Sequence, residues 1–224
     1  MSVYREKNIW KRNLLVLRRS LPVLLGMAGL ILIAFPLSFL PDLIENEMVE
    51  ARSKGLGMIH GLLLLGSLLP CLALLPYWTE ENSSELLHAA VKIRAPRLVE
   101  LLWILRFYFL IVLVPIATAC VLLQLSLLEL LRMMLELLLV FGLYYLLLSL
   151  LQSALLGAMT LTIYILFCLL ECRSAPQKNF CLIRPDLPYY NGFFEHEGVL
   201  LLPAAVLCGL VGYFIEKETP GINR

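Results

Sequence analysis

The side chains of this sequence that could do chemistry are sparse, and they do not combine into a catalytic or metal-binding pattern. The histidines His60, His88 and His196 fall in one apolar run and two separate polar segments, so their spacing does not bring them to one metal ion. The glutamate pair in TEEN, positions 79–82, lacks the arginine four residues later that a membrane-embedded metalloprotease of this pattern requires. Neither a His-Glu-x-x-His motif nor a Gly-x-Ser-Gly motif occurs. We therefore predict that the chain is not an enzyme and has no catalytic, metal-binding or cofactor-binding residue.

The elements that must position any site are membrane-spanning helices. Of 224 residues, 60% are hydrophobic and 16% charged, and the mean hydropathy is +0.85. A soluble domain is about 45–50% apolar with about a quarter of its residues charged. The apolar residues come in runs of the length, roughly 20 residues, that crosses a bilayer as a helix. The predicted fold is an all-α polytopic membrane protein, with one transmembrane domain over 1–224. Its six predicted transmembrane helices cover 21–40, 58–76, 101–124, 135–151, 153–171 and 198–215.

The fourth and fifth spans emerge from a single apolar run, positions 136–171, which is too long for one helix across a bilayer. A tight turn near Ser149, Gln152 and Ser153 is predicted to divide it. Hydroxyl and amide groups in these spans have two interpretations. They line a translocation path for an amphipathic cargo, or they bond one helix to another. The residues assigned to the possible path are Tyr144, Tyr145, Gln152, Thr160 and Tyr164.

Lysine and arginine counts predict the orientation, because cytoplasmic loops carry the excess of these residues. The side holding the N-terminal segment, the 77–100 loop and the C-terminal tail has 11 of them, and the opposite side has 6. Both termini are therefore predicted to be cytoplasmic, and 172–197 is predicted to be an extracellular loop. The pairing of its Cys172 and Cys181 stays open. The basic, amphipathic 1–20 segment is predicted to lie as a helix in the cytoplasmic interface, or to serve as an ordinary charged anchor.

Ionisable residues within the predicted spans are few. His60 is the deep one, Glu136 lies near the outer start of the fourth span, and Arg132 is assigned to an outer loop. Ion-coupled transporters place acidic residues or broken helices near the middle of the membrane. The sequence therefore favours an energy source in a partner over an ion gradient. A lone histidine in a span is interpreted as a structural residue.

The polar 77–100 segment, between the second and third spans, has the signals of a short capped helix over 82–94. Asn82 is suited to the N-cap and Glu85 completes a capping box, while Pro96 ends the helical geometry. An apolar stripe follows the cap, and basic residues occupy the last turn, where the helix dipole favours them. Such a helix either covers lipid as an interfacial connector or docks a cytoplasmic partner. The residues assigned to docking are Glu80, Glu81, Asn82, Ser83, Ser84, Glu85, Leu86, Leu87, His88, Val91, Lys92 and Arg94.

This arrangement resembles the membrane permease of a type-2 ABC transporter, the transmembrane subunit of an ABC exporter. The resemblance lies in six spans with cytoplasmic termini and in TEENSSELLHAAVKIRAPRLVELL, positions 79–102. This stretch follows the family's order of an acidic residue, a polar turn, an ELL helix, basic residues and a long third span. The polar cluster at 82–84 replaces the glycine usual in the turn. The long outer loop has no recognisable family motif.

The resemblance implies that the 82–94 helix is a coupling helix seated on a separate ATPase subunit, which binds ATP and Mg²⁺. It also implies a second permease chain, identical or homologous, in the bacterial cytoplasmic membrane. The sequence itself has no Gly-x-x-x-x-Gly-Lys-Ser/Thr motif, and no basic stretch is suited to nucleic acid. The expected cargo is amphipathic, first a peptide and next a lipid or drug. The alternatives are a non-transporting membrane scaffold or immunity protein, and a secondary transporter.

Overall fold

A computed structural model describes the helical parts of the chain. The described residues are 18, 21–22, 25–26, 29, 44, 55, 59–68, 97–122, 124, 127–171 and 198–218. The predicted coupling helix over 82–94 and the 172–197 loop, with Cys172 and Cys181, lie outside the described residues.

Five continuous helices make up this part of the chain. They are Ile59–Leu68, α5 (Arg97–Leu122), α6 (Leu127–Leu151), α7 (Ala154–Glu171) and α9 (Gly198–Glu218). Three of them, α5, α6 and α9, are long and apolar enough to cross a membrane. The described part is therefore all-helical, as predicted, and its helices identify a membrane protein. The full set of six spans stays a prediction.

Helix α6 begins at Leu127 and includes the predicted 135–151 span. Gln124 ends the preceding helix: it adopts a left-handed backbone (φ 51°), and its N–H donates to the Val121 carbonyl at 3.2 Å. Only a few residues then separate α5 from α6. Arg132, assigned to an outer loop, consequently lies inside a helix. The loop assignment of Arg132 was wrong because it treated a charge between the apolar runs as a loop residue, whereas charges that pair along one helix face can be buried.

The turn between α6 and α7 lies at Gln152 and Ser153, within the stretch where the sequence predicts it. Gln152 takes the left-handed conformation, with φ at 52°. Ser153 caps α7: its Oγ accepts the Leu156 N–H at 3.3 Å, and its carbonyl accepts the Gly157 N–H at 3.0 Å. Local turn chemistry thus folds the apolar run into a helical hairpin.

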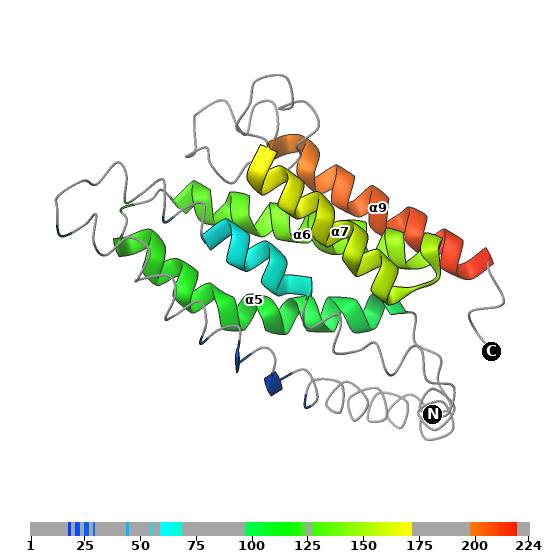
Figure 1. Ribbon diagram of the computed structural model, residues 1–224, viewed down its shortest axis with the longest axis horizontal. Helices are drawn as coiled ribbons and strands as arrows, with labels where there is room; N and C mark the ends of the chain where they lie inside the picture. Colours follow the sequence, from blue (N-terminus) through cyan, green and yellow to red (C-terminus); the bar gives the residue numbers. More distant parts are fainter. Residues whose placement is uncertain are drawn as a thin grey trace, which may run out of the picture.

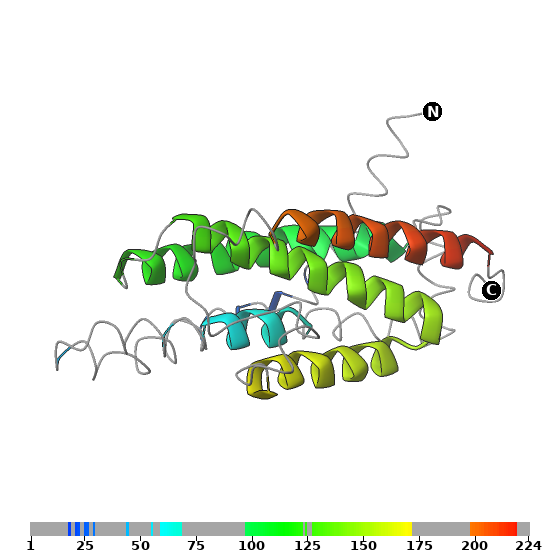
Figure 2. The same cartoon turned by 90° about the horizontal axis from the view of Figure 1, so that it is seen from above.

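Helix α6 is the centre of the bundle. It packs most extensively against α9, and also against α7 and α5. Figure 2 shows α9 and α7 on opposite sides of α6, and in Figure 1 the Ile59–Leu68 helix, drawn in cyan, lies between α5 and α7. One cluster of buried apolar side chains joins Ile59–Leu68, α5, α6 and α7, and a smaller one joins α6 to α9. Any side chain on the inner faces of α6 is therefore enclosed by protein.

Glycine allows α6 and α9 to approach closely. A Cβ atom added at Gly142 of α6 would lie 2.7 Å from the Ala205 carbonyl oxygen of α9. At Gly212 of α9, an added Cβ would lie 2.9 Å from the Tyr145 ring. Small residues at such crossings let helix backbones meet in membranes, where packing contributes much of the association energy.

We expect Gly142→Ala to lower the thermal unfolding midpoint of the purified protein in detergent. The new methyl group would press on a backbone carbonyl that cannot rotate away, and overpacking of this kind costs about 1–3 kcal/mol. Gly209→Ala, on the same helix pair, is the matched control, because an added Cβ there meets no atom within 4 Å. Equal midpoints for the two variants would contradict the close α6–α9 contact.

Candidate functional site

Three charged residues lie along one face of α6. Glu129, Arg132 and Glu136 are spaced at i, i+3 and i+7, which places them on successive turns of the same face. The first and last are about 10 Å apart along the axis, at 1.5 Å per residue. All three are at least 98% shielded from solvent. The helix thus carries a row of charges into its apolar span.

Arg132 bridges the two carboxylates. Its Nε donates to Oε1 of Glu136 at 3.0 Å, and its Nη1 lies 3.7 Å from Oε2 of Glu129. The Glu136 contact has hydrogen-bond geometry, whereas the Glu129 contact is a looser ion pair. Within the described part of the chain, neither carboxylate oxygen of Glu129 accepts a hydrogen bond. Of these two described carboxylates, Arg132 thus binds Glu136 through a hydrogen bond and Glu129 through charge.

His60 brings a second helix to this row. Its Nε2 lies 3.2 Å from Oε2 of Glu136, the oxygen not used by Arg132, and the imidazole is fully buried. Tyr108 of α5 fastens the histidine's helix, because its hydroxyl donates to the Leu63 carbonyl at 2.7 Å. Four ionisable groups from two helices thus form one buried site, which we call the charge cluster: His60, Glu129, Arg132 and Glu136.

The charge cluster overturns the interpretation that the spans are nearly free of ionisable groups and that His60 stands alone. The α6 part carries a signal that the sequence reasoning missed, because the spacing of Glu129, Arg132 and Glu136 places them on one helical face. The contact with His60 has no such signal, since it joins segments far apart in the chain. Ionisable residues enclosed within membrane helices are costly and mark functional sites.

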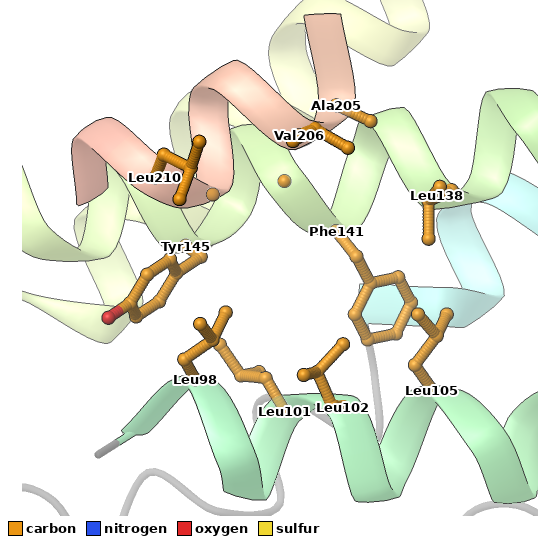
Figure 3. A pocket seen from close by; sticks show the side chains of 12 residues that line it. Leu98, Leu101, Leu102, Leu105, Leu138, Phe141, Tyr145, Ala205, Val206 and Leu210 are labelled. Carbon is orange, nitrogen blue, oxygen red and sulfur yellow. The ribbon is translucent and has the colours of Figure 1, made fainter. Parts of the chain in front are cut away.

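A second feature is an apolar pocket between α5, α6 and α9, with a volume of about 220 Å³ (Figure 3). Leucines of α5 form one wall, and Figure 3 shows Phe141 and Tyr145 of α6 and Val206 and Leu210 of α9 opposite them. Among the described lining residues, only Tyr145 brings a polar side-chain atom. The pocket suits a hydrocarbon group and offers nothing to bind an ion.

The residues assigned to a translocation path occupy different environments. Tyr144 and Tyr145 are buried in the core, Tyr164 is half-buried, and Gln152 and Thr160 are exposed. Tyr145 lines the pocket, and the other four do not. The Tyr145 hydroxyl also donates to the Glu216 carboxylate of α9, so this residue bonds one helix to another. The path formed by all five stays a prediction.

The residues assigned to partner docking, from Glu80 to Arg94, lie outside the described residues. Among those that are described, no group of three His, Cys, Asp or Glu side chains is placed to hold a metal ion. Comparison with protein-family models, curated proteins and solved structures finds no match to this chain.

We expect Arg132→Met to destabilise the protein severely, by about 3–5 kcal/mol, because it leaves two buried carboxylates without their cation. Adding Glu136→Gln to this variant should restore part of the loss, since it removes one of the orphaned charges. Arg106→Met is the control: Arg106 is exposed on α5, over the Trp103 ring. Denaturant unfolding in one detergent checks all three, and equal effects of Arg132→Met and Arg106→Met would contradict the buried pairing.

Proposed function

We propose that the chain is the membrane-spanning permease subunit of an ATP-driven exporter of the type-2 ABC class. It would reside in the bacterial cytoplasmic membrane with both termini cytoplasmic. The observation that carries this proposal is the capped 82–94 segment, set between apolar runs of a membrane protein whose sequence has no nucleotide-binding motif. ATP and Mg²⁺ would be bound by a separate ATPase subunit on which this helix is seated.

The helix arrangement supports a mechanical role for that segment. Helix α5 begins at Arg97, directly after Pro96, so 82–94 is followed at once by a long apolar helix. Helix α5 packs on α6, and α6 packs on α7 and α9. Closure of the ATPase subunits would push on 82–94, and a rigid-body shift of α5 would reach the other helices through α6.

The pocket supports an amphipathic cargo. Its apolar walls accommodate an acyl chain or the side chains of an apolar peptide segment, and its position at the junction of α5, α6 and α9 exposes it to movement of α5. A peptide is the first expectation, and a lipid or drug the next. A second permease chain, identical or homologous, would complete the translocation path. Helix α9 offers it an apolar surface, since Leu202, Leu207 and Phe214 are exposed in the single chain.

The test is co-purification with the P-loop ATPase encoded nearest to this gene. We expect the wild-type chain to retain that ATPase. The Glu81→Lys, Glu85→Lys variant should co-purify with at least tenfold less ATPase, or should leave ATP hydrolysis uncoupled from transport. The reversed charges would remove the acidic start and the capping box of the predicted helix. Glu218→Lys, at the exposed end of α9, is the control. Unchanged assembly and unchanged hydrolysis in the double variant would refute the docking role and favour a scaffold or immunity protein.

The charge cluster favours a second candidate, a secondary transporter, because buried ionisable groups are the means by which such proteins couple to ions. The two candidates differ in energy source. Liposomes holding this chain alone and an imposed proton gradient should move a fluorescent amphipathic peptide only if it is a secondary transporter. As a permease, it should move the same probe only with the ATPase and ATP present.

A further inference from the structure

We propose that the charge cluster is a proton-binding site that takes up and releases one proton, and that the bound proton lies between His60 and Glu136. This inference goes beyond the exporter function and is independent of how transport is energised. It rests on three observations: the number of charges in the cluster, the distances between them, and the assignment of the groups to two separate helices.

Counted over the described residues, the charges of the cluster do not balance without an added proton. Glu129 and Glu136 contribute two negative charges and Arg132 one positive charge, so the cluster carries one net negative charge when His60 is neutral. These side chains are almost completely shielded, and three of them belong to α6, which is long and apolar enough to cross a membrane. An uncompensated charge in such surroundings is costly, and a single proton removes it.

The distances locate the proton. Arg132 occupies Oε1 of Glu136, and Oε2 faces the His60 Nε2 atom at 3.2 Å. A proton on Nε2 makes this contact an ion pair between imidazolium and carboxylate. Among the described residues, no group of three His, Cys, Asp or Glu side chains is placed to hold a metal ion here.

Glu129 supplies the charge that makes the proton necessary. Arg132 can neutralise only one carboxylate, and it is hydrogen-bonded to Glu136. The Glu129 oxygens, which accept no hydrogen bond within the described part of the chain, lie in electrostatic range of Arg132, His60 and Glu136. Glu129 is also near the end of the apolar stretch of α6 that starts at Leu128, while Glu136 lies about 10 Å deeper. A proton would therefore enter from the α6 N-terminal end.

Other titratable groups do not account for the same behaviour. The charged side chains that face His60 in the described residues come from α6. The other packed helices contribute the buried Tyr108 phenol from α5 and the buried Cys168 thiol from α7. Unperturbed phenols and thiols titrate near pH 10 and 8.5, above the range in which an imidazole exchanges its proton.

The site links proton occupancy to helix contact. His60 belongs to Ile59–Leu68, and the other three groups belong to α6. A bound proton makes the histidine positive and draws its helix to the negative face of α6, and release of the proton removes that attraction. Because all four groups are shielded, exchange with water requires the two helices to separate locally.

The experiment is a titration of the full-length protein in lipid nanodiscs, followed by the ¹⁵N resonances of its three histidines. His60 is assigned by the signal lost in His60→Asn. We expect the His60 resonances to report the uptake of one proton as the pH is lowered. In Glu129→Gln, His60 should bind the proton at least tenfold more weakly, because Arg132 and Glu136 then neutralise each other. Glu218→Gln, a charge removed at an exposed site, should leave the titration unchanged.

Two results would overturn the proposal. One is a His60 that keeps a single protonation state from pH 4 to 9, or titrates at the same pH in Glu129→Gln as in the wild type. The other is a midpoint that moves with Na⁺ or K⁺ concentration at constant ionic strength, which would identify a metal cation as the ligand. Glu129→Gln leaves the hydrogen-bonded Arg132–Glu136 pair intact, so the test does not depend on a variant that disrupts folding.

Discussion

The pairing of Arg132 with Glu136 is the interaction on which the rest of the described structure depends. A guanidinium and a carboxylate enclosed among apolar helices are tolerable only because each neutralises the other through a 3.0 Å hydrogen bond. That requirement fixes which face of α6 turns inward. It also leaves Oε2 of Glu136 toward His60, and thereby determines where the Ile59–Leu68 helix sits. The apolar core encloses these polar groups, and their hydrogen bond and ion pairs allow few other arrangements of the two helices.

Helix α6 has two kinds of interface. On one side, polar groups meet Ile59–Leu68, and the Tyr108 hydrogen bond to Leu63 holds that helix against α5. Against α9, Gly142 allows the Ala205 backbone to approach closely, and this backbone packing adds to the Tyr145–Glu216 hydrogen bond. Polar pairs are sensitive to charge and proton occupancy, whereas close backbone packing is not. The α6–α9 contact is therefore suited to be the rigid part of the bundle, and the Ile59–Leu68 contact the adjustable one.

The pocket and the charge cluster are connected through α6. Phe141 and Tyr145 line the pocket, and Glu136 lies little more than one turn before Phe141 on the same helix. A shift of α6 that alters one site would alter the other. In the proposed exporter, movement of α5 would shift α6. The proposed proton would bias the position of the Ile59–Leu68 helix relative to α6. Binding at one site can influence the other in this way only when occupancy of each site changes which position of the shared helix is favoured.

Hydropathy and local turn chemistry were sufficient to predict an all-helical membrane protein and the turn at Gln152 and Ser153. Both depend on interactions between near neighbours in the chain, which the sequence states directly. The coupling helix over 82–94 stays a prediction from such local signals. The assignment of Arg132 to a loop was wrong, because the cost of burying it is offset only when its partners are counted with it. The contacts of His60 with Glu136 and of Gly142 with Ala205 were decided by the tertiary structure alone. They join distant segments whose approach depends on the packing of every helix between them.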